Sequence, residues 1–362
     1  MKNATVIALR TVAAILIIAT FMPLLTFKEW YIRIFDFPRA QIFVLAGVTL
    51  LVFLAMRMWR LRLDKVLLIG LVASLVFEAV NIYPYTFFSP YQVAPAPADA
   101  PEDGQLSILV SNVYQDNEEY HLLIDLIRDR NPDILITLET DSAWQEALRP
   151  VTDQYPERVE IPESNTYGMH LYSKLPLRQT RIRYLLDDDV PSVRTYVQLR
   201  NGTWVELHAV HPKPPVPTED PDSRRRDAEI VIIGKEVKES NYPVIVAGDF
   251  NDVAWSHTTT LFQEVSGLLD PRIGRGFYNT FHAKYKVLRW PLDHIFHSDH
   301  FKLISLERLP HIKSDHFPIF AILSFAPENA QQQAEPQADE ETHEEAEETV
   351  EEGKEAARED KK

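Results

Sequence analysis

Three long apolar stretches in the first 83 residues constrain the fold of this chain more than any other feature. They cover residues 5–27, 40–56 and 66–83. An α-helix rises about 1.5 Å per residue, so each stretch is roughly long enough to cross a hydrocarbon core of about 30 Å. A cleavable signal peptide would have one short apolar core, and these stretches are apolar all round instead of along one stripe. The sequence therefore predicts three transmembrane helices. The alternative is a buried helical hairpin of a soluble protein.

Basic residues between the second and third stretches predict how these helices are oriented. Arg57, Arg60, Arg62 and Lys65 lie there, with Asp64 as the single acid of that connection. Connections rich in Lys and Arg stay in the cytoplasm. Three spans then place residue 84 onward on the other side. We predict a multi-pass protein of the inner (cell) membrane, in contact with the lipid bilayer, with a periplasmic or otherwise extracytoplasmic domain.

Glu78 is an acid inside the third apolar stretch. A carboxylate within a membrane helix is a candidate functional group. Because Glu78 is close to the exit end of that stretch, we favour an interfacial acid.

Two segments flank the globular part of the chain. Residues 84–104 are rich in Pro and Ala, which is typical of a semi-extended linker. Residues 327–362 carry fourteen Asp and Glu against four Lys and Arg, with almost no aliphatic residues. Such a composition cannot bury enough apolar surface to offset its ordering entropy. We predict an acidic, disordered or at most transiently helical tail. Its role is either solvation, which we favour, or the binding of a partner, and the sequence does not identify a protein partner.

Residues 105–326 alternate strand-like and helix-like segments, which indicates an α/β domain with two sheets and helices outside them. The chain has no cysteine, so disulfides, thiolate-bound metals and thiol nucleophiles are excluded. The predicted strands are 105–113, 133–139, 168–173, 195–199, 203–210, 244–247, 292–296 and 317–323, and the predicted helices are 120–130, 227–239 and one that contains Trp144.

Polar residues at the ends of these strands predict the chemistry. Glu139 ends a run of Ile, Leu and Thr, and the segment 248–252 (GDFND) follows the apolar run PVIVA. Asp293 lies in LDHIF, and Asp315 and His316 precede FPIFAIL. A single Asp before a turn is usually a cap, but four such acids in one domain favour a site for a divalent cation.

The order of these motifs resembles the endonuclease/exonuclease/phosphatase superfamily, which has the deoxyribonuclease I-like fold. GDFND followed by SDHFP is the most specific part, and the resemblance covers about 105–326. It implies a four-layered α/β sandwich, with two mixed sheets face to face and helices outside. The layout is similar to a membrane-anchored bacterial group of the superfamily.

The resemblance implies a metal and phosphate site. Glu139 corresponds to the principal Mg²⁺ ligand, with Mn²⁺ as the other expected cation, and Asp315 resembles a second acid of the metal region. Asn112 and Asn251 correspond to amides that hold phosphate oxygens.

The resemblance also implies four catalytic residues. Asp249 matches the acid that orients or deprotonates the attacking water, and His316 the histidine at the scissile phosphate. Asp293 matches the carboxylate that fixes the His316 tautomer. His211 matches a phosphate-facing histidine; His208 is the competing choice, and strand alternation places the two on opposite faces. We favour His211 because a Pro-rich turn follows it.

Some positions depart from the family pattern. Leu138 stands where a glutamine is common, and Asp141 is the second residue after Glu139. The ring of His294 is expected to pack or to form a surface hydrogen bond. The run 224–226 (RRR) either grips phosphate or begins a solvated helix.

We predict a Mg²⁺- or Mn²⁺-dependent phosphoesterase whose substrate is a phosphate ester. The domain between the linker and the tail is acidic and tethered near a membrane, which favours a lipid or small phosphoester over long nucleic acid. The alternative is a nuclease that acts on DNA or RNA. A catalytically silent scaffold is a third class. Motifs for nucleoside-triphosphate motors, zincins and serine hydrolases are not present.

Overall fold

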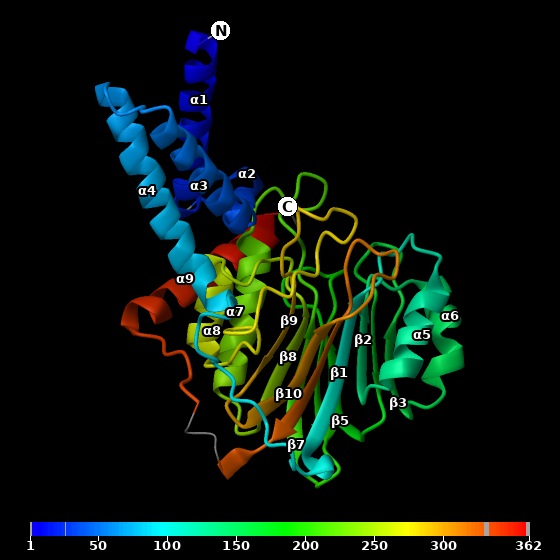
Figure 1. The fold of residues 1–362 in the computed structure, drawn as a ribbon. Helices are drawn as coiled ribbons and strands as arrows, with labels where there is room; N and C mark the ends of the chain where they lie inside the picture. The colour runs from blue at the N-terminus through cyan, green and yellow to red at the C-terminus, as the bar shows by residue number, and fades with distance from the viewer. Residues whose placement is uncertain (1, 26, 329–332, 360–362) are drawn as a thin grey trace.

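The computed structural model describes residues 2–25, 27–328 and 333–359, and the strands of this part form two mixed β-sheets (Figure 1). The six-stranded sheet has the order β10 (Phe301–Arg308), β11 (Ile319–Phe325), β1 (Gln105–Asn112), β2 (Ile134–Leu138), β4 (Met169–Ser173) and β3 (Glu157–Ile161). The five-stranded sheet has the order β5 (Leu177–Arg183), β6 (Ser192–Gln198), β7 (Trp204–Val210), β8 (Val244–Asp249) and β9 (Asp293–His297). Two pairs, β1 with β2 and β7 with β8, are parallel.

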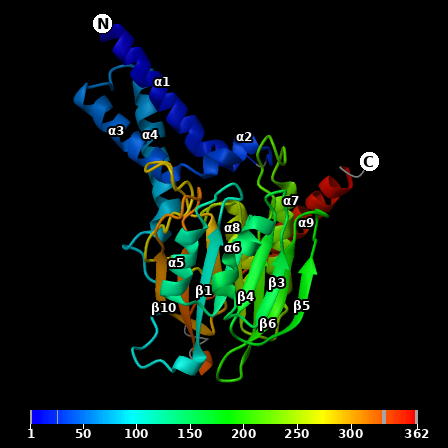
Figure 2. The same cartoon turned by 90° about the vertical axis from the view of Figure 1, so that its right-hand side faces the viewer.

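The alternation of side chains along each central strand builds the layers. In β1, Leu106 and Ile108 belong to the core between the sheets, whereas Leu109 packs under the helices on the outer face. In β8, Ile245 belongs to the central core and Val246 to a second outer core. Successive side chains of a strand point to opposite faces, so each strand contributes to two cores. The outer helices are α5 (Tyr120–Arg130) and α6 (Ser142–Thr152) on the larger sheet, and α7 (Arg224–Lys238) and α8 (His257–Ser266) on the smaller one. The result is an α/β fold of two sheets with helices on their outer faces (Figure 2).

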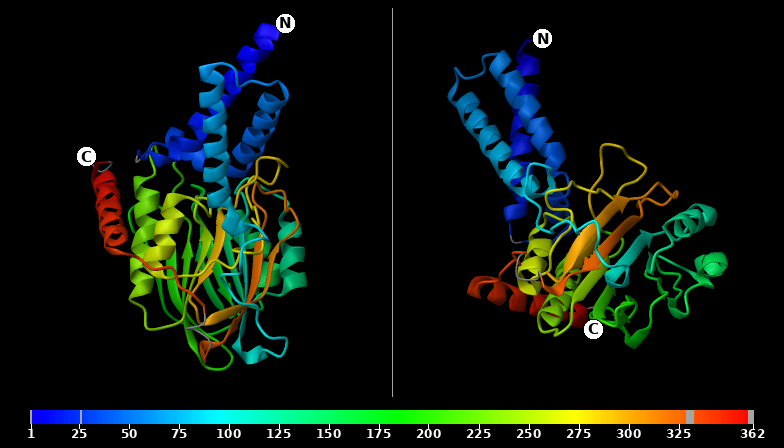
Figure 3. Two further views of the ribbon diagram at one scale, coloured as in Figure 1. Left: turned by 60° about the vertical axis from the view of Figure 1, so that its left-hand side comes forward. Right: turned by 60° about the horizontal axis from the view of Figure 1, so that its bottom comes forward.

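Three N-terminal helices project together from one end of this domain in every view (Figures 1, 2 and 3). They are α1 (Lys2–Phe21), α3 (Arg39–Ala55) and α4 (Arg62–Ile82), and the short α2 (Trp30–Arg33) precedes α3. Ala4–Leu24 and Arg62–Tyr85 are long and apolar enough to cross a membrane. The third candidate span is a bent pair, Trp30–Asp36 and Arg39–Ala55, with an angle of 70°. Pro38 lies at this bend, where its own ψ of 29° is outside the helical region and its ring leaves it without a backbone N–H to donate.

The predicted linker is more ordered than its composition indicates. Val93 is fully buried in the core between the sheets. The backbone N–H of Ala96 donates to the carbonyl of Leu303 over 2.8 Å, and the N–H of Leu303 donates to the carbonyl of Ala94 over 3.0 Å. The segment therefore runs along the edge of β10 instead of forming a free spacer, because it satisfies the backbone groups of that edge strand.

The tail is the clearest correction to the sequence-based expectation. Instead of being disordered, its residues Glu340–Glu359 form α9, which packs on α7 and α8 (Figure 1). The few small and apolar residues of the tail are spaced for one helix face, and Ala346 and Val350 join a core with Val231 of α7. A Cβ on Gly353 would lie 2.2 Å from the Cβ of Ala228, so the two helices approach closely there. The regular spacing of these residues and the close approach of α9 to α7 therefore offset the low apolar content of the tail.

One acid of α7, Glu229, is buried. Glu229 is 2% exposed, and its Oε1 atom has no hydrogen-bond partner in the described part of the chain. Burial, with a smaller effect of Asp187, raises the pKa of Glu229 from 4.5 to about 8. The native state therefore keeps a proton that the unfolded chain loses above about pH 4.5, and stability falls as the pH rises from there to about 8.

We expect Glu229→Gln to raise the free energy of unfolding at pH 8 by up to about 4 kcal/mol and to leave it nearly unchanged at pH 4. The measurement is urea unfolding of the full chain in detergent at both pH values. Glu239→Gln, at the exposed end of the same helix, is the matched control and should show no such difference. An equal gain at both pH values would contradict the explanation.

Candidate active site

The ends of β1, β2 and β8 bring an amide and two carboxylates together. β1 and β2 are parallel with Asn112 opposite Leu138, so Glu139 follows at the same edge. The Nδ2 atom of Asn112 donates to Glu139 Oε1 over 2.8 Å and to Asp249 Oδ2 over 3.1 Å. Asn112 therefore links the two sheets at the edge from which the N-terminal helices project (Figure 1).

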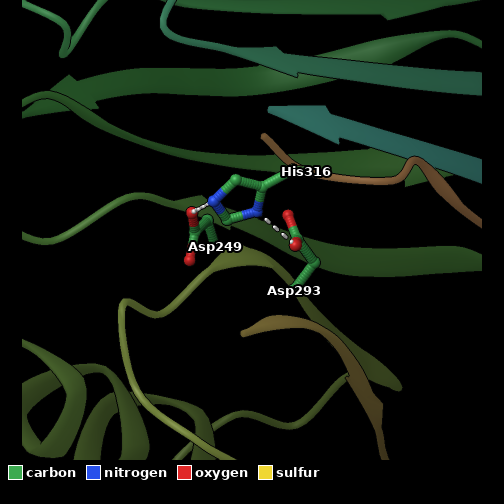
Figure 4. Close-up of side chains that lie close together, drawn as sticks. All are labelled: Asp249, Asp293 and His316. Carbon is green, nitrogen blue, oxygen red and sulfur yellow. Dashed lines mark hydrogen bonds and ion pairs between the residues drawn. The ribbon is translucent and has the colours of Figure 1, made fainter. Parts of the chain in front are cut away.

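His316 lies between two buried carboxylates at this edge (Figure 4). Asp249 and Asp293 are opposite each other in the antiparallel pair β8–β9. The ring of His316 reaches both, with Nδ1 at 2.8 Å from Asp293 Oδ2 and Nε2 at 3.5 Å from Asp249 Oδ2. Like charges directly opposite on a sheet repel each other. A cationic ring between them removes that repulsion.

The surroundings hold His316 in its protonated form. Burial alone would lower its pKa, but Asp293 and Asp249 outweigh burial and raise the pKa to about 10. Both ring nitrogens then carry protons, and Asp293 fixes the orientation through Nδ1. The Nε2–H remains the group that a substrate oxygen at this edge can meet.

Ligand atoms of Asp249, Asp293 and His316 lie within 4.8 Å of one another, so they form a possible metal group. A protonated imidazole has no lone pair for a cation, so the ion-paired form of this group does not suit a metal. Glu139 is better suited to bind a metal ion. Withdrawal of its carboxyl group from water raises its pKa to about 7, and nearby Asp315 and Asp249 act in the same direction. A cluster of carboxylate oxygens short of positive charge fits a hard divalent cation.

Asn251 and His211 complete the edge. The backbone N–H of Asn251 donates to Asp249 Oδ1 over 2.9 Å, and its Nδ2 donates one hydrogen to the carbonyl of Pro212 over 2.9 Å. His211 is 3% exposed, and burial lowers its pKa to about 4 despite the charge of Asp249. Its Nδ1 has no partner among the described residues. The structure thus places a neutral imidazole beside Asp249.

A glycine lets the strand pass close to its neighbour just before Asp249. Gly248 has a φ of +149°, and a Cβ there would lie 1.9 Å from the carbonyl oxygen of Val210. Any other residue would push β8 away from β7 and displace Asp249.

Other residues with sequence-based roles lie outside the edge. His208 contacts Glu206 through Nε2 at 2.8 Å. His294 is buried, with Nε2 at 2.9 Å from the carbonyl of Asp252. Asp141 caps α6 by accepting from the N–H of Trp144. These side chains have structural partners of their own.

Two residues near the site have no sequence-based role that fits their position. Arg226 is 3% exposed, so it neither begins a solvated helix nor reaches outward; its Nη1 donates to the carbonyl of Asn251 over 2.8 Å. The ring of Phe281 lies 4.9 Å from that of His316. Three consecutive arginines were the signal for Arg226, but Phe281 lies in a long loop with no motif.

The comparison with protein families agrees with this arrangement. The model of the Endonuclease/Exonuclease/phosphatase family matches residues 109–316, which is more than half of the chain. The chain belongs to this family. No curated protein matches the chain in sequence.

Solved structures of similar fold include enzymes from two animals. The human Nocturnin catalytic domain with bound sulfate anion has a TM-score of 0.51 at 17% identity, covering 67% of this chain and 99% of that chain. D. rerio TDP2 complexed with single-strand DNA product has a TM-score of 0.50 at 16% identity, covering 61% of this chain and 99% of that chain. At 16% and 17% identity, the similarity to these two structures shows that this endonuclease/exonuclease/phosphatase family member shares their fold.

Members of the endonuclease/exonuclease/phosphatase family are hydrolases of phosphate esters. In this member, the family match runs from within β1 to His316 and so contains all eight residues with sequence-based site roles. Those residues meet at one edge of the sandwich, which makes that edge the candidate active site.

Proposed function

We propose that the chain is a membrane-anchored phosphoesterase that uses Mg²⁺ or Mn²⁺ and cleaves by in-line attack of water on phosphorus. The observation that carries this proposal is the placement of protonated His316 between Asp249 and Asp293, at the same edge as Glu139. The hydrolysis of an anionic ester requires a cationic hydrogen-bond donor close to a carboxylate that accepts a proton. His316 and Asp249 are such a pair, with Nε2 and Oδ2 3.5 Å apart.

Each side chain has a task that follows from its contacts. Glu139 and Asp315 would hold the divalent cation, which neutralises charge on the phosphate oxygens. Asp249 is held through both oxygens, and burial raises its pKa, so it can orient the water and accept its proton. His316 donates through Nε2 to an oxygen on the phosphorus.

The amides and the second histidine assist. Asn251 keeps one Nδ2 hydrogen for a phosphate oxygen, and Asn112 connects the metal side of the site to Asp249. His211, neutral at pH 7, supplies one further N–H. Asp293 acts through His316 and is a positioning residue.

Membrane anchoring is supported by the composition of the N-terminal helices. Exposed aromatic side chains gather where these helices meet the domain, including Tyr31, Tyr83, Phe87 and Phe88. Trp and Tyr concentrate at the membrane–water interface. The basic connection between α3 and α4 lies at the opposite end of the helices, which favours an extracytoplasmic catalytic domain (Figure 1).

This topology makes a testable prediction. In a Gram-negative host, an alkaline phosphatase joined to the C-terminus is expected to be active and a green fluorescent protein at the same position dark. Replacing Arg57, Arg60 and Arg62 by glutamine is expected to lower the phosphatase activity and to raise the fluorescence of these fusions. A fluorescent fusion with an inactive phosphatase would reverse the orientation.

The activity is tested on the full chain in detergent with Mg²⁺, Mn²⁺ or EDTA. The substrates are bis-p-nitrophenyl phosphate, p-nitrophenyl phosphate and supercoiled plasmid. We expect metal-dependent release of nitrophenol from the diester or the monoester, and none from Asp249→Asn. Nicking of the plasmid that Asp249→Asn abolishes would make the chain a nuclease. No turnover of any substrate by a folded, Mn²⁺-binding protein would overturn the proposed function.

A further inference from the structure

An apolar cavity of about 440 Å³ lies between the N-terminal helices and the candidate active site. One wall comes from the short segment before α3, with Trp30, Ile34 and Phe37. Its volume is within the range of about 300–1,000 Å³ that is typical of small-molecule sites.

Two loops of the catalytic domain form the other walls. Pro214, Pro215 and Val216 follow His211 in the chain, and Leu288 and Trp290 come from the loop before β9. The walls are joined by contacts across the junction. Gln41 Nε2 donates to the carbonyl of Val287 over 2.7 Å, and the rings of Phe37 and Trp290 are 5.7 Å apart, edge to face. The cavity is therefore built jointly by the N-terminal segment and the catalytic domain.

The cavity adjoins the reacting groups. Asn251 lines it and donates its backbone N–H to Asp249. Phe281 also lines it, and its ring is 4.9 Å from that of His316. A molecule whose phosphate lies at Asp249 and His316 can therefore place its remaining part in this cavity.

The lining selects the chemistry of that part. Among the described residues, the lining is apolar apart from Arg33 and Asn251. Arg33 is 7% exposed, and its Nε has no hydrogen-bond partner in the described part of the chain. A nucleic acid strand would instead require a row of cationic contacts to its phosphates, and Arg33 is the single cationic side chain among the described residues that line the cavity. A hydrocarbon chain next to an anionic group matches the lining.

We propose that this cavity binds the hydrocarbon part of the substrate, so that the enzyme acts on an anionic lipid phosphoester. This proposal rests on the proposed phosphoesterase function and specifies its substrate class. Its position supports the same occupant. Residues of the N-terminal segment and of the domain line the cavity, and Val287, next to the lining residue Leu288, is 75% exposed. Figure 3 shows the junction at which the N-terminal helices meet the domain. A lipid can enter there with little exposure of its chain to water.

The test compares two esters that differ only in chain length. Methyl and octyl p-nitrophenyl phosphate are hydrolysed by the full chain in Mn²⁺, with the octyl ester below its critical micelle concentration and with a non-micellar amphipol in place of detergent. Each buried methylene group adds about fourfold to binding. We expect kcat/KM for the octyl ester to exceed that for the methyl ester by at least about tenfold.

Variants of exposed wall residues make the test specific. Val216→Trp fills the cavity and is expected to reduce the octyl-to-methyl ratio of kcat/KM to near 1. Val216→Ser, at the same position, leaves the cavity open and should keep most of the ratio. Leu288→Trp is a second filling variant should the first not fold. As a direct readout, Trp30 and Trp290 fluorescence should respond to octylphosphonate at lower concentration than to methylphosphonate.

The outcomes separate the two proposals. A ratio near 1 in the wild-type protein, with both esters hydrolysed, overturns the lipid inference and leaves the phosphoesterase in place. A high ratio that Val216→Trp and Leu288→Trp leave unchanged also overturns it, because the chain then binds elsewhere. If octylphosphonate binds but neither ester nor plasmid is cleaved, the proposed function fails, and with it the inference that rests on it.

Discussion

Replacing His316 with alanine is expected to lower kcat for ester hydrolysis by about 10²–10⁴-fold. The ring is the cationic donor at the edge of the sheets, and its Nε2 lies 3.5 Å from Asp249. Removing it takes away the proton donor and also the charge that separates Asp249 from Asp293. The effect should appear in kcat more than in KM, since the donor acts on charge that develops in the transition state.

A loss of stability accompanies this change and must be measured with it. Without the His316 cation, the two buried carboxylates of Asp249 and Asp293 are expected to lower the free energy of unfolding by about 3 kcal/mol or more at pH 7. Asp293→Asn in the same background removes one of them and should restore part of the stability without restoring activity. Circular dichroism and urea unfolding establish that each variant is folded. His300→Ala, at the half-exposed His300 on the other side of the domain, is the control and should keep full activity.

Asp293→Asn alone distinguishes positioning from charge. The amide can still contact His316 Nδ1, but it no longer stabilises the protonated ring. We expect a loss of kcat smaller than that of His316→Ala. An unchanged rate in His316→Ala, with the protein folded, would remove this residue from the mechanism.

Glu139→Gln is expected to abolish metal-dependent hydrolysis and to weaken Mn²⁺ binding by at least about 100-fold. The glutamine keeps the size and the contact with Asn112 but removes the charge. The affinity is measured by titrating the full chain with Mn²⁺ and following the free ion by electron paramagnetic resonance. This measurement does not depend on the substrate.

The stability of the metal-free protein provides the second half of this test. Because withdrawal from water raises the pKa of Glu139 to about 7, its ionised form is unfavourable in the folded chain without a cation. In EDTA, Glu139→Gln should therefore be as stable as the wild type or more stable. Asp141→Asn, two residues along the chain, is the control: it keeps the oxygen that caps α6, removes one charge and should leave Mn²⁺ affinity unchanged. Unchanged affinity in Glu139→Gln would place the metal elsewhere, with the Asp249, Asp293 and His316 group as the next candidate.

The central strands were predictable because their alternation is local. In β1 and β8 the side chains divide between two cores with a period of two, and the sequence carries that pattern openly. The edge strand β5 was not predicted: its sequence LRQTRIR is mostly exposed, and its pairing with β6 stabilises it in place of burial. The edge strands β3 and β10 were not predicted either, although apolar residues such as Val159, Phe301 and Leu303 of these strands belong to the core between the sheets.

The tail and the linker depended on distant partners. Ala346 and Val350 have too little apolar area to order a segment alone, and only the surfaces of α7 and α8 make a helix there favourable. Val93 is buried because the two sheets leave room for it beside β10. Such contacts join residues more than 100 positions apart and leave no local pattern.

The sequence by itself determined the apolar N-terminal helices as candidates, the alternation of strands and helices, and the polar residues at the strand ends. These depend on composition and short-range spacing, which act within a few residues. Only the tertiary structure decided that His316 lies between Asp249 and Asp293, that Arg226 holds the carbonyl of Asn251, and that an apolar cavity joins the N-terminal segment to the site. The physical reason is that burial, ion pairing and cavity walls arise where separate elements meet, and their strength depends on distances that no single segment contains.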